Sequence, residues 1–110
     1  MNHPRRGDVF LVNVGRGAVG AEIKKSRPAI VISNDISNKY LTRYQVIPLT
    51  SKVDRVYPSE ILVTIGRQTS KAMANQIQTA DRERFIRFLG RISKEEMFHV
   101  NRVLKIQLDL

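Results

Sequence analysis

The spacing of apolar residues changes once along this chain, near residue 93, and that change limits the fold more than any other feature. Before it, short apolar segments alternate with polar residues, or run on for a few residues, as strands do. After it, Ser93 and Glu96 form a capping box, and apolar residues recur at helical spacing from residue 97 to residue 108. The chain is therefore predicted to be mainly β with α, its one C-terminal helix having about four turns.

Six segments ahead of that helix are predicted to be strands. They are residues 8–14, 28–33, 44–49, 60–64, 71–79 and 85–92. Residues 15–26, 34–39 and 51–59 are predicted to be loops or turns, because they are rich in Gly, Asn, Ser and charged residues. Pro48 has no backbone N–H, so it is expected at a sheet edge, a bulge or a strand end. A single domain, residues 1–110, is expected: a small, strongly curved barrel of five or six strands with the helix packed against it.

Positive charge dominates the composition, with 19 Lys and Arg against 10 Asp and Glu and a net charge of +9. A basic domain of this size commonly binds a polyanion, either a nucleic acid or an acidic protein. The absence of cysteine excludes disulfides, thiolate zinc sites and cysteine nucleophiles, and it suits the reducing cytoplasm. No apolar run approaches the roughly 18 residues of a membrane span, and the N-terminus lacks the pattern of a secretory signal. A cytoplasmic protein with no membrane partner is therefore expected.

A G-x-G-x-x-G pattern lies between Gly15 and Gly20, and Asp35 follows where a dinucleotide-binding fold places its ribose-binding acid. That fold needs a helix that opens at the glycines and packs on a sheet. Few residues after Gly17 are apolar, and the basic segment 24–28 ends in proline. A glycine-containing loop with a basic end is therefore preferred to a nucleotide site.

The residues offer little for metal chemistry. His3 and His99 are the only histidines, and the carboxylates do not cluster apart from Glu95 and Glu96, which belong to the helix cap. We therefore expect no metal and no other cofactor. Cleavage of RNA through its own 2′-hydroxyl suits this inventory, because the substrate supplies the nucleophile. The protein then only holds the phosphate, donates hydrogen bonds and moves protons.

Six short motifs, in order and in register, carry a family resemblance. They are residues 6–9, Glu22 with residues 26–32, residues 33–35, 48–51, 75–81 and 89–93. With them the chain resembles the MazF/PemK family of bacterial toxins, which are ribosome-independent mRNA interferases, from residue 5 to its end. No single motif is specific, but six together over one short domain are.

The resemblance implies a fold and a set of partners. The fold would be a small SH3-like β-barrel of the CcdB/PemK type with a C-terminal helix. The activity would be metal-independent, sequence-specific cleavage of single-stranded RNA (mRNA, or also rRNA or tRNA), leaving a 2′,3′-cyclic phosphate and a 5′-hydroxyl. The family also implies a homodimer with RNA along its interface, an acidic antitoxin that covers this groove, and operator DNA bound by the toxin–antitoxin complex.

The same resemblance assigns the site residues. The family's catalytic arginine and threonine fall on Arg27 and Thr50, which would stabilise the pentacoordinate phosphate and bind a non-bridging oxygen. Glu22 falls on an RNA-contacting position and would accept a proton, although an ion pair with Lys24 or Lys25 is an equal alternative.

Further residues are expected to contact RNA. Lys52 and Arg55 would bind phosphates, or form a solvated basic loop. Asn34 falls on a position that contacts RNA in the family. Bases would be contacted by Gln76, Gln78 and Thr79, unless these only fill the exposed face of the sheet.

Two departures from the family and two rival functions limit these assignments. Met73, Ala74 and Asn75 stand where one branch has an Arg-x-Asp pair for acid–base chemistry, and Gln78 stands where a basic residue is common. A non-catalytic toxin of the same fold, binding gyrase or another protein, is one rival. A structural RNA- or DNA-binding barrel is the other, but an aromatic content of 6% is low for a base-stacking surface.

Overall fold

The computed structural model describes residues 3–14 and 26–110. Within these residues the chain forms seven strands, two α-helices and two short 3₁₀ turns. They are β1 (Asp8–Asn13), β2 (Ser26–Val31), α1 (Asp35–Tyr40), β3 (Arg43–Thr50), β4 (Glu60–Ile65), β5 (Gln68–Met73), η1 (Ala74–Gln76), β6 (Gln78–Asp81), η2 (Arg82–Arg84), β7 (Phe85–Arg91) and α2 (Lys94–Leu108). The G-x-G-x-x-G segment, residues 15–20, falls outside the described residues. Asp35 is described and is the first residue of α1.

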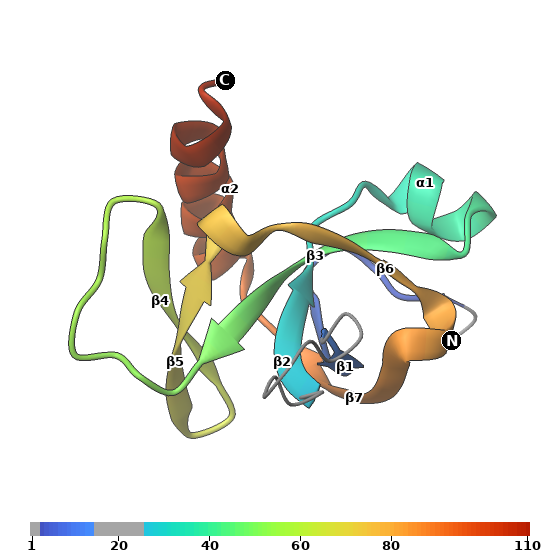
Figure 1. Cartoon of the computed structure of the whole chain (residues 1–110), viewed down its shortest axis with the longest axis horizontal. Helices are drawn as coiled ribbons and strands as arrows, with labels where there is room; N and C mark the ends of the chain where they lie inside the picture. Colours follow the sequence, from blue (N-terminus) through green and yellow to red (C-terminus); the bar gives the residue numbers. More distant parts are fainter. Residues whose placement is uncertain (1–2, 15–25) are drawn as a thin grey trace, which may run out of the picture.

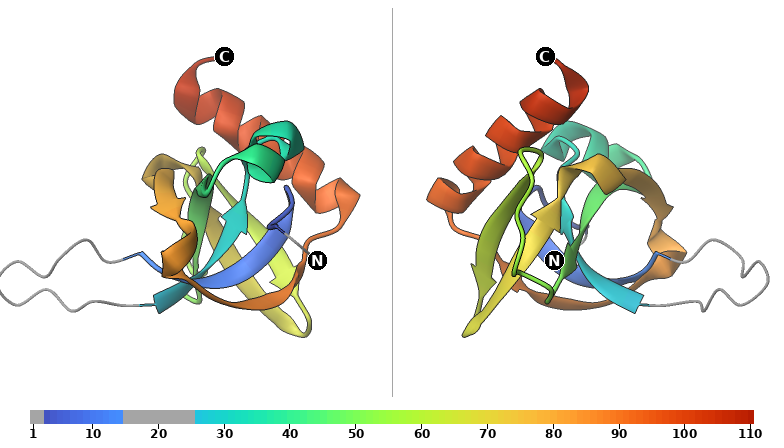
Figure 2. Two further views of the ribbon diagram at one scale, coloured as in Figure 1. Left: turned by 90° about the vertical axis from the view of Figure 1, so that its right-hand side faces the viewer. Right: turned by 60° about the vertical axis from the view of Figure 1, so that its left-hand side comes forward.

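The strands form one antiparallel sheet in the order β4-β5-β3-β2-β1-β7, and β6 pairs with the first half of β3. The sheet curls, and α2 crosses one side of it (Figures 1 and 2). The two outer strands approach each other, since a Cβ on Gly90 of β7 would lie 3.5 Å from Ile65 Cγ2 of β4. The predicted class, mainly β with a C-terminal helix on a strongly curved sheet, is confirmed.

The central strands bury both of their faces. Ile30 and Ile47 contribute to a core that α2 closes with Val100 and Val103. The alternate residues of the same strands, such as Val31, belong to a second core with Phe10 and Tyr44. Because successive side chains of a strand point to opposite faces, β2 and β3 are fixed from both sides. The strand ends are therefore held in place for the site described below.

Helix α2 begins where the sequence predicts. The Ser93 hydroxyl accepts a hydrogen bond from Glu96 N at 3.0 Å, and Glu96 Oε1 accepts one from Ser93 N at 3.2 Å. The other oxygen of the Glu96 carboxylate accepts a hydrogen bond from Thr64 N of β4 at 2.6 Å. The capping residue therefore also ties the start of the helix to the sheet.

The predicted turn at residues 34–39 is wrong, because this segment forms α1. Asn34 caps the helix, its side chain accepting a hydrogen bond from Ser37 N at 2.8 Å. Asn38 is fully buried, and its side chain donates to Ser33 O and accepts from Ser33 Oγ. The turn-forming residues thus serve as a cap and an anchor of one short helix.

The predicted single strand over residues 71–79 is also wrong. It is broken at η1, so β5 ends at Met73 and β6 begins at Gln78. Strand β3 pairs with β6 as far as Val46 and with β5 from Leu49 onward. Pro48 lies between these two pairings, and on its other side it is paired with Ala29 of β2. It therefore marks the point where β3 changes its partner, inside the strand rather than at its end.

Candidate active site

Three polar side chains lie in one row across the strands β2, β3 and β5. Strand β2 pairs with β3 through Ala29 and Pro48, and continuing that register by two residues sets Arg27 opposite Thr50. On its other side Thr50 pairs with Lys71 of β5. Residues directly opposite each other on neighbouring strands have Cβ atoms about 4.5–5.5 Å apart. The strand pairing therefore gathers an arginine, a threonine and a lysine where β2 begins and β3 ends.

A pocket of about 410 Å³ opens at this row, and both Arg27 and Thr50 line it. The other lining residues are Pro28, Leu49, Ser51, Ile65, Gln68, Ser70 and Leu89. Arg27 and Thr50 are both half-buried, so each reaches the pocket while its strand remains anchored. The structure thus brings the two predicted catalytic side chains to one pocket; their chemical roles stay predictions.

Both side chains have donors to spare. Thr50 Oγ1 accepts a hydrogen bond from Lys52 N at 3.3 Å, which leaves its own proton to donate. The Arg27 guanidinium makes no hydrogen bond or ion pair with residues 3–14 or 26–110. A guanidinium and a hydroxyl that face one pocket with free N–H and O–H groups can bind a tetrahedral or pentacoordinate phosphate.

Residues 51–59, between β3 and β4, form a loop beside this pocket. Lys52 and Arg55 are exposed on it, as expected for phosphate contacts. Lys71 is buried beneath the loop and forms an ion pair with Glu60 at 3.2 Å. Lys71 is not among the predicted site residues, although a lysine before the apolar segment Ala72–Ala74 is an unusual feature that points to a paired charge.

The remaining predicted RNA contacts do not line the pocket. Gln78 pairs with Val46, which lies four residues before Thr50 along β3, or about 13 Å away at the usual rise. Thr79 Oγ1 accepts a hydrogen bond from Gln45 Nε2 at 3.0 Å, and Gln76 is exposed on η1.

Two further residues from the sequence analysis also lie elsewhere. Asn34 lies beyond the far end of β2 from Arg27, where it caps α1. Glu22 lies outside the described residues. Among the described residues the structure therefore brings together Arg27 and Thr50, with Lys52 and Arg55 nearby, but not Asn34, Gln76, Gln78 or Thr79.

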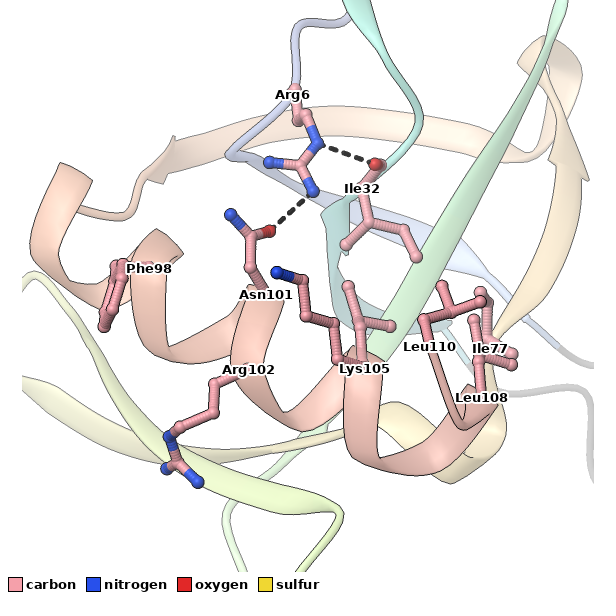
Figure 3. Close-up of a pocket in the computed structure, with 10 residues that line it drawn as sticks. Arg6, Ile32, Ile77, Phe98, Asn101, Arg102, Lys105, Leu108 and Leu110 are labelled. Atoms are coloured by element: carbon pink, nitrogen blue, oxygen red, sulfur yellow. Dashed lines mark hydrogen bonds between the residues drawn. The ribbon is translucent and has the colours of Figure 1, made fainter.

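A larger cavity, of about 650 Å³, lies against α2 (Figure 3). Arg6 enters it with its guanidinium already bound: Nε donates to Ile32 O at 2.9 Å, and Nη2 donates to Asn101 Oδ1 at 2.6 Å. Burial lowers the pKa of Arg6 below its ordinary value, and the charge of Asp35 partly offsets this effect. The rest of the lining combines apolar residues with Arg102 and Lys105: Ile32, Ile77, Phe98, Leu104, Leu108 and Leu110.

No group of three or more His, Cys, Asp or Glu side chains in the described part of the chain is arranged to hold a metal ion. Neither α-helix of the described part is long and apolar enough to cross a membrane.

The curled antiparallel half-barrel with a C-terminal helix is a fold that solved bacterial toxins share. The chain belongs to the PemK-like, MazF-like toxin family of type II toxin–antitoxin systems, whose model matches residues 5–108. The family membership that the six motifs indicated is thereby confirmed.

Relatives cover nearly the whole chain. The endoribonuclease MazF9 of Mycobacterium tuberculosis is 39% identical over 115 residues, which cover 96% of this chain and 97% of that protein. The endoribonuclease MazF of Staphylococcus saprophyticus is 30% identical, covering 96% and 92%. Among solved structures, a mycobacterial endoribonuclease in complex with its cognate antitoxin has a TM-score of 0.81 at 23% identity, covering 97% of this chain and 96% of that one. This structural likeness supports the fold.

Proposed function

We propose that this toxin is a metal-independent endoribonuclease that cleaves single-stranded RNA at the Arg27–Thr50 pocket. The carrying observation is that these two side chains, from separate strands, line one pocket with donors unused among the described residues. The net charge of +9 supports a polyanionic substrate. Relatives named endoribonucleases at 39% and 30% identity support the activity.

In the proposed reaction the RNA cuts itself. The 2′-oxygen bonds to the adjacent phosphorus, the bond from phosphorus to the 5′-oxygen breaks, and a 2′,3′-cyclic phosphate and a 5′-hydroxyl result. Arg27 and Thr50 donate hydrogen bonds to the non-bridging oxygens as negative charge develops on them. The 2′-hydroxyl proton passes to a base, for which Glu22 is our candidate, and the 5′-oxygen gains a proton from Arg27 or from water. Arg27 is not the base, because a guanidinium barely deprotonates.

The lining of the pocket suits an unstacked nucleotide. Pro28 and Leu89 offer apolar surface to a base, while the exposed Gln68 offers hydrogen-bonding groups to its edge. Protein recognition of RNA sequence acts on single strands, whose bases can be splayed out. The pocket therefore supports single-stranded RNA as the substrate, whether mRNA, rRNA or tRNA.

Cleavage of synthetic single-stranded RNA in excess EDTA tests this proposal. The wild-type protein is expected to cut, and Thr50→Ala is expected to lose about a hundredfold or more in rate, the scale of deleting one oxyanion donor. Thr64→Ala, a change to an exposed threonine of β4, is the matched control and is expected to cut normally. Cleavage only after a divalent cation is added would overturn the mechanism. No cleavage by a protein that still arrests growth would favour the gyrase-binding alternative.

The partners are part of the proposal. A second copy of this chain would cover the cavity against α2, where Phe98 and Leu110 are 67% and 86% exposed. An acidic antitoxin would bind the basic groove of the dimer, as supported by the antitoxin complex of the mycobacterial neighbour. The complex of both would bind operator DNA in the cytoplasm. Leu108→Glu puts a carboxylate on the proposed dimer surface and is expected to yield monomers in light scattering; an unchanged dimer would place the interface elsewhere.

A further inference from the structure

We propose that Lys71 and Glu60 are positioning residues, which hold the loop 51–59 so that Lys52 and Arg55 bind the RNA backbone beside the Arg27–Thr50 pocket. This inference rests on the proposed function, because it assigns a role in RNA binding to the same site. Neither residue is placed in contact with the substrate.

The ammonium group of Lys71 contacts Glu60 of β4 and two residues of the loop. Its side chain is nearly buried, with 9% of the residue exposed, and Nζ lies 3.2 Å from Glu60 Oε1. The same Nζ donates a hydrogen bond to the backbone carbonyl of Arg55 at 2.9 Å. It also lies 6.0 Å from the centre of the Tyr57 ring, within the range of a cation–π contact. The contacts of the ammonium group therefore lie on β4 and on the loop, and none of them is with a residue that lines the pocket.

Glu60 holds a second point of the loop. It is 8% exposed, and Oε1 accepts a hydrogen bond from Tyr57 N at 2.9 Å. Arg55 Nη1 in turn donates to the Tyr57 hydroxyl at 3.2 Å. The buried ion pair thus fixes the carbonyl of Arg55 and the amide of Tyr57 in a segment that has neither helix nor strand (Figure 1).

The Lys71–Glu60 ion pair lies next to the pocket, so the position it gives the loop 51–59 affects RNA binding. Lys71 is the cross-strand partner of Thr50, and the loop leaves β3 directly after Thr50. Lys52 N donates to the Thr50 hydroxyl at 3.3 Å, so the first residues of the loop lie beside the pocket. A buried ion pair is a poor source of stability, because desolvation offsets most of the attraction. Its clearest effect here is geometric: it sets where two basic side chains lie relative to the pocket.

The substitution Lys71→Met tests the inference, since methionine fills similar space without charge. Its loop is expected to move freely, so KM for RNA rises about tenfold while kcat changes by less than about twofold. The slope of log Kd against log salt concentration is expected to shrink by up to about two, one for each phosphate that Lys52 and Arg55 no longer bind. Lys94→Met removes the same charge from an exposed site at the start of α2 and is the matched control.

A double-mutant cycle separates positioning from general destabilisation. If Lys71 acts through Lys52 and Arg55, then Lys71→Met adds little to the KM of the variant Lys52→Ala/Arg55→Ala. Fully additive effects would overturn the proposal, because the ion pair would then act by another route. An effect of Lys71→Met no larger than that of Lys94→Met would overturn it as well.

Glu60→Gln provides a second variant should Lys71→Met fail to fold, since glutamine keeps an acceptor for Tyr57 N. We expect the same direction of change in KM, with faster amide hydrogen exchange over residues 51–59. Unchanged KM and unchanged exchange would overturn the proposal. A wild-type protein that neither binds nor cuts RNA would instead overturn the proposed function, and with it the role in RNA binding.

Discussion

Arg6 and Arg27 line different cavities of the described structure, and their guanidinium groups differ in how many partners they have. Arg6 enters the 650 Å³ cavity already bound to the Ile32 carbonyl and the Asn101 side chain. Arg27 enters the 410 Å³ pocket with no such partner among the described residues. Arg6 uses two of its five guanidinium N–H groups to hold Ile32, directly after β2, and α2 together. Arg27 uses none of its guanidinium N–H groups within the described residues, so all of them can bind a substrate. The larger cavity is therefore not the proposed active site.

The difference comes from what each arginine can reach. Arg6 lies at a chain crossing, where its backbone N donates to Asp35 and its side chain reaches Asn101 of α2. Arg27 lies at the start of β2, opposite the end of β3, where Thr50 is its nearest polar neighbour by register. Strand ends are places where backbone positions are fixed but side chains still face solvent. Replacement by alanine is therefore expected to lower RNA cleavage at Arg27 and the free energy of unfolding at Arg6.

The largest expected effect is the loss of cleavage in Arg27→Ala. Removing a donor to the developing negative charge is expected to lower kcat by a hundredfold or more, about 2.7 kcal/mol. The free energy of unfolding is expected to change by less than about 0.5 kcal/mol, because no bond within the described residues is lost. RNA cleavage and urea unfolding measure the two quantities. Near-normal cleavage by Arg27→Ala would show that Arg27 does not act on the substrate.

Arg6→Ala is expected to act on stability instead. It leaves the Ile32 carbonyl and the Asn101 side chain without their donor, at a loss of about 2 kcal/mol in the free energy of unfolding. Arg102→Ala, in the same cavity, is the control and is expected to lose less than about 0.5 kcal/mol. Urea unfolding measures both. Cleavage per folded molecule should survive in Arg6→Ala, and its loss would place Arg6 in the catalytic machinery.

Features that depend on neighbouring residues could be predicted from the sequence. The capping box of α2 and its apolar stripe lie within a few residues of each other, and both are found where expected. The meeting of Arg27 and Thr50 in one pocket followed from the family motifs, together with their places at the start and the end of two strands. In these cases a local pattern, or a known fold, carried the necessary information.

Features that depend on distant residues could not be predicted. The Arg6–Asn101 bond spans 95 positions of sequence, and no local pattern marks it. The role of Lys71 appears only once β4 and β5 pair and bring Glu60 beside it. The break at η1 reflects the change of partner along β3, whereas the sequence from 71 to 79 alternates like one strand. Tertiary pairing overrides local preference at each of these points.

Asn34 offers the smallest test, because the family resemblance predicts an RNA contact there, whereas in the structure its side chain caps α1. Asn34→Ala is expected to destabilise the protein by about 1 kcal/mol in urea unfolding, since Ser37 N loses its acceptor. Asn34→Ser keeps a capping hydroxyl and is expected to retain most of that stability. RNA affinity then separates the two roles. Normal RNA binding by Asn34→Ser would show that Asn34, like Arg6, serves the fold and not the substrate. Weakened RNA binding at normal stability would show that this capping residue also contacts RNA. A side chain that is hydrogen-bonded within the fold could then still bind the substrate.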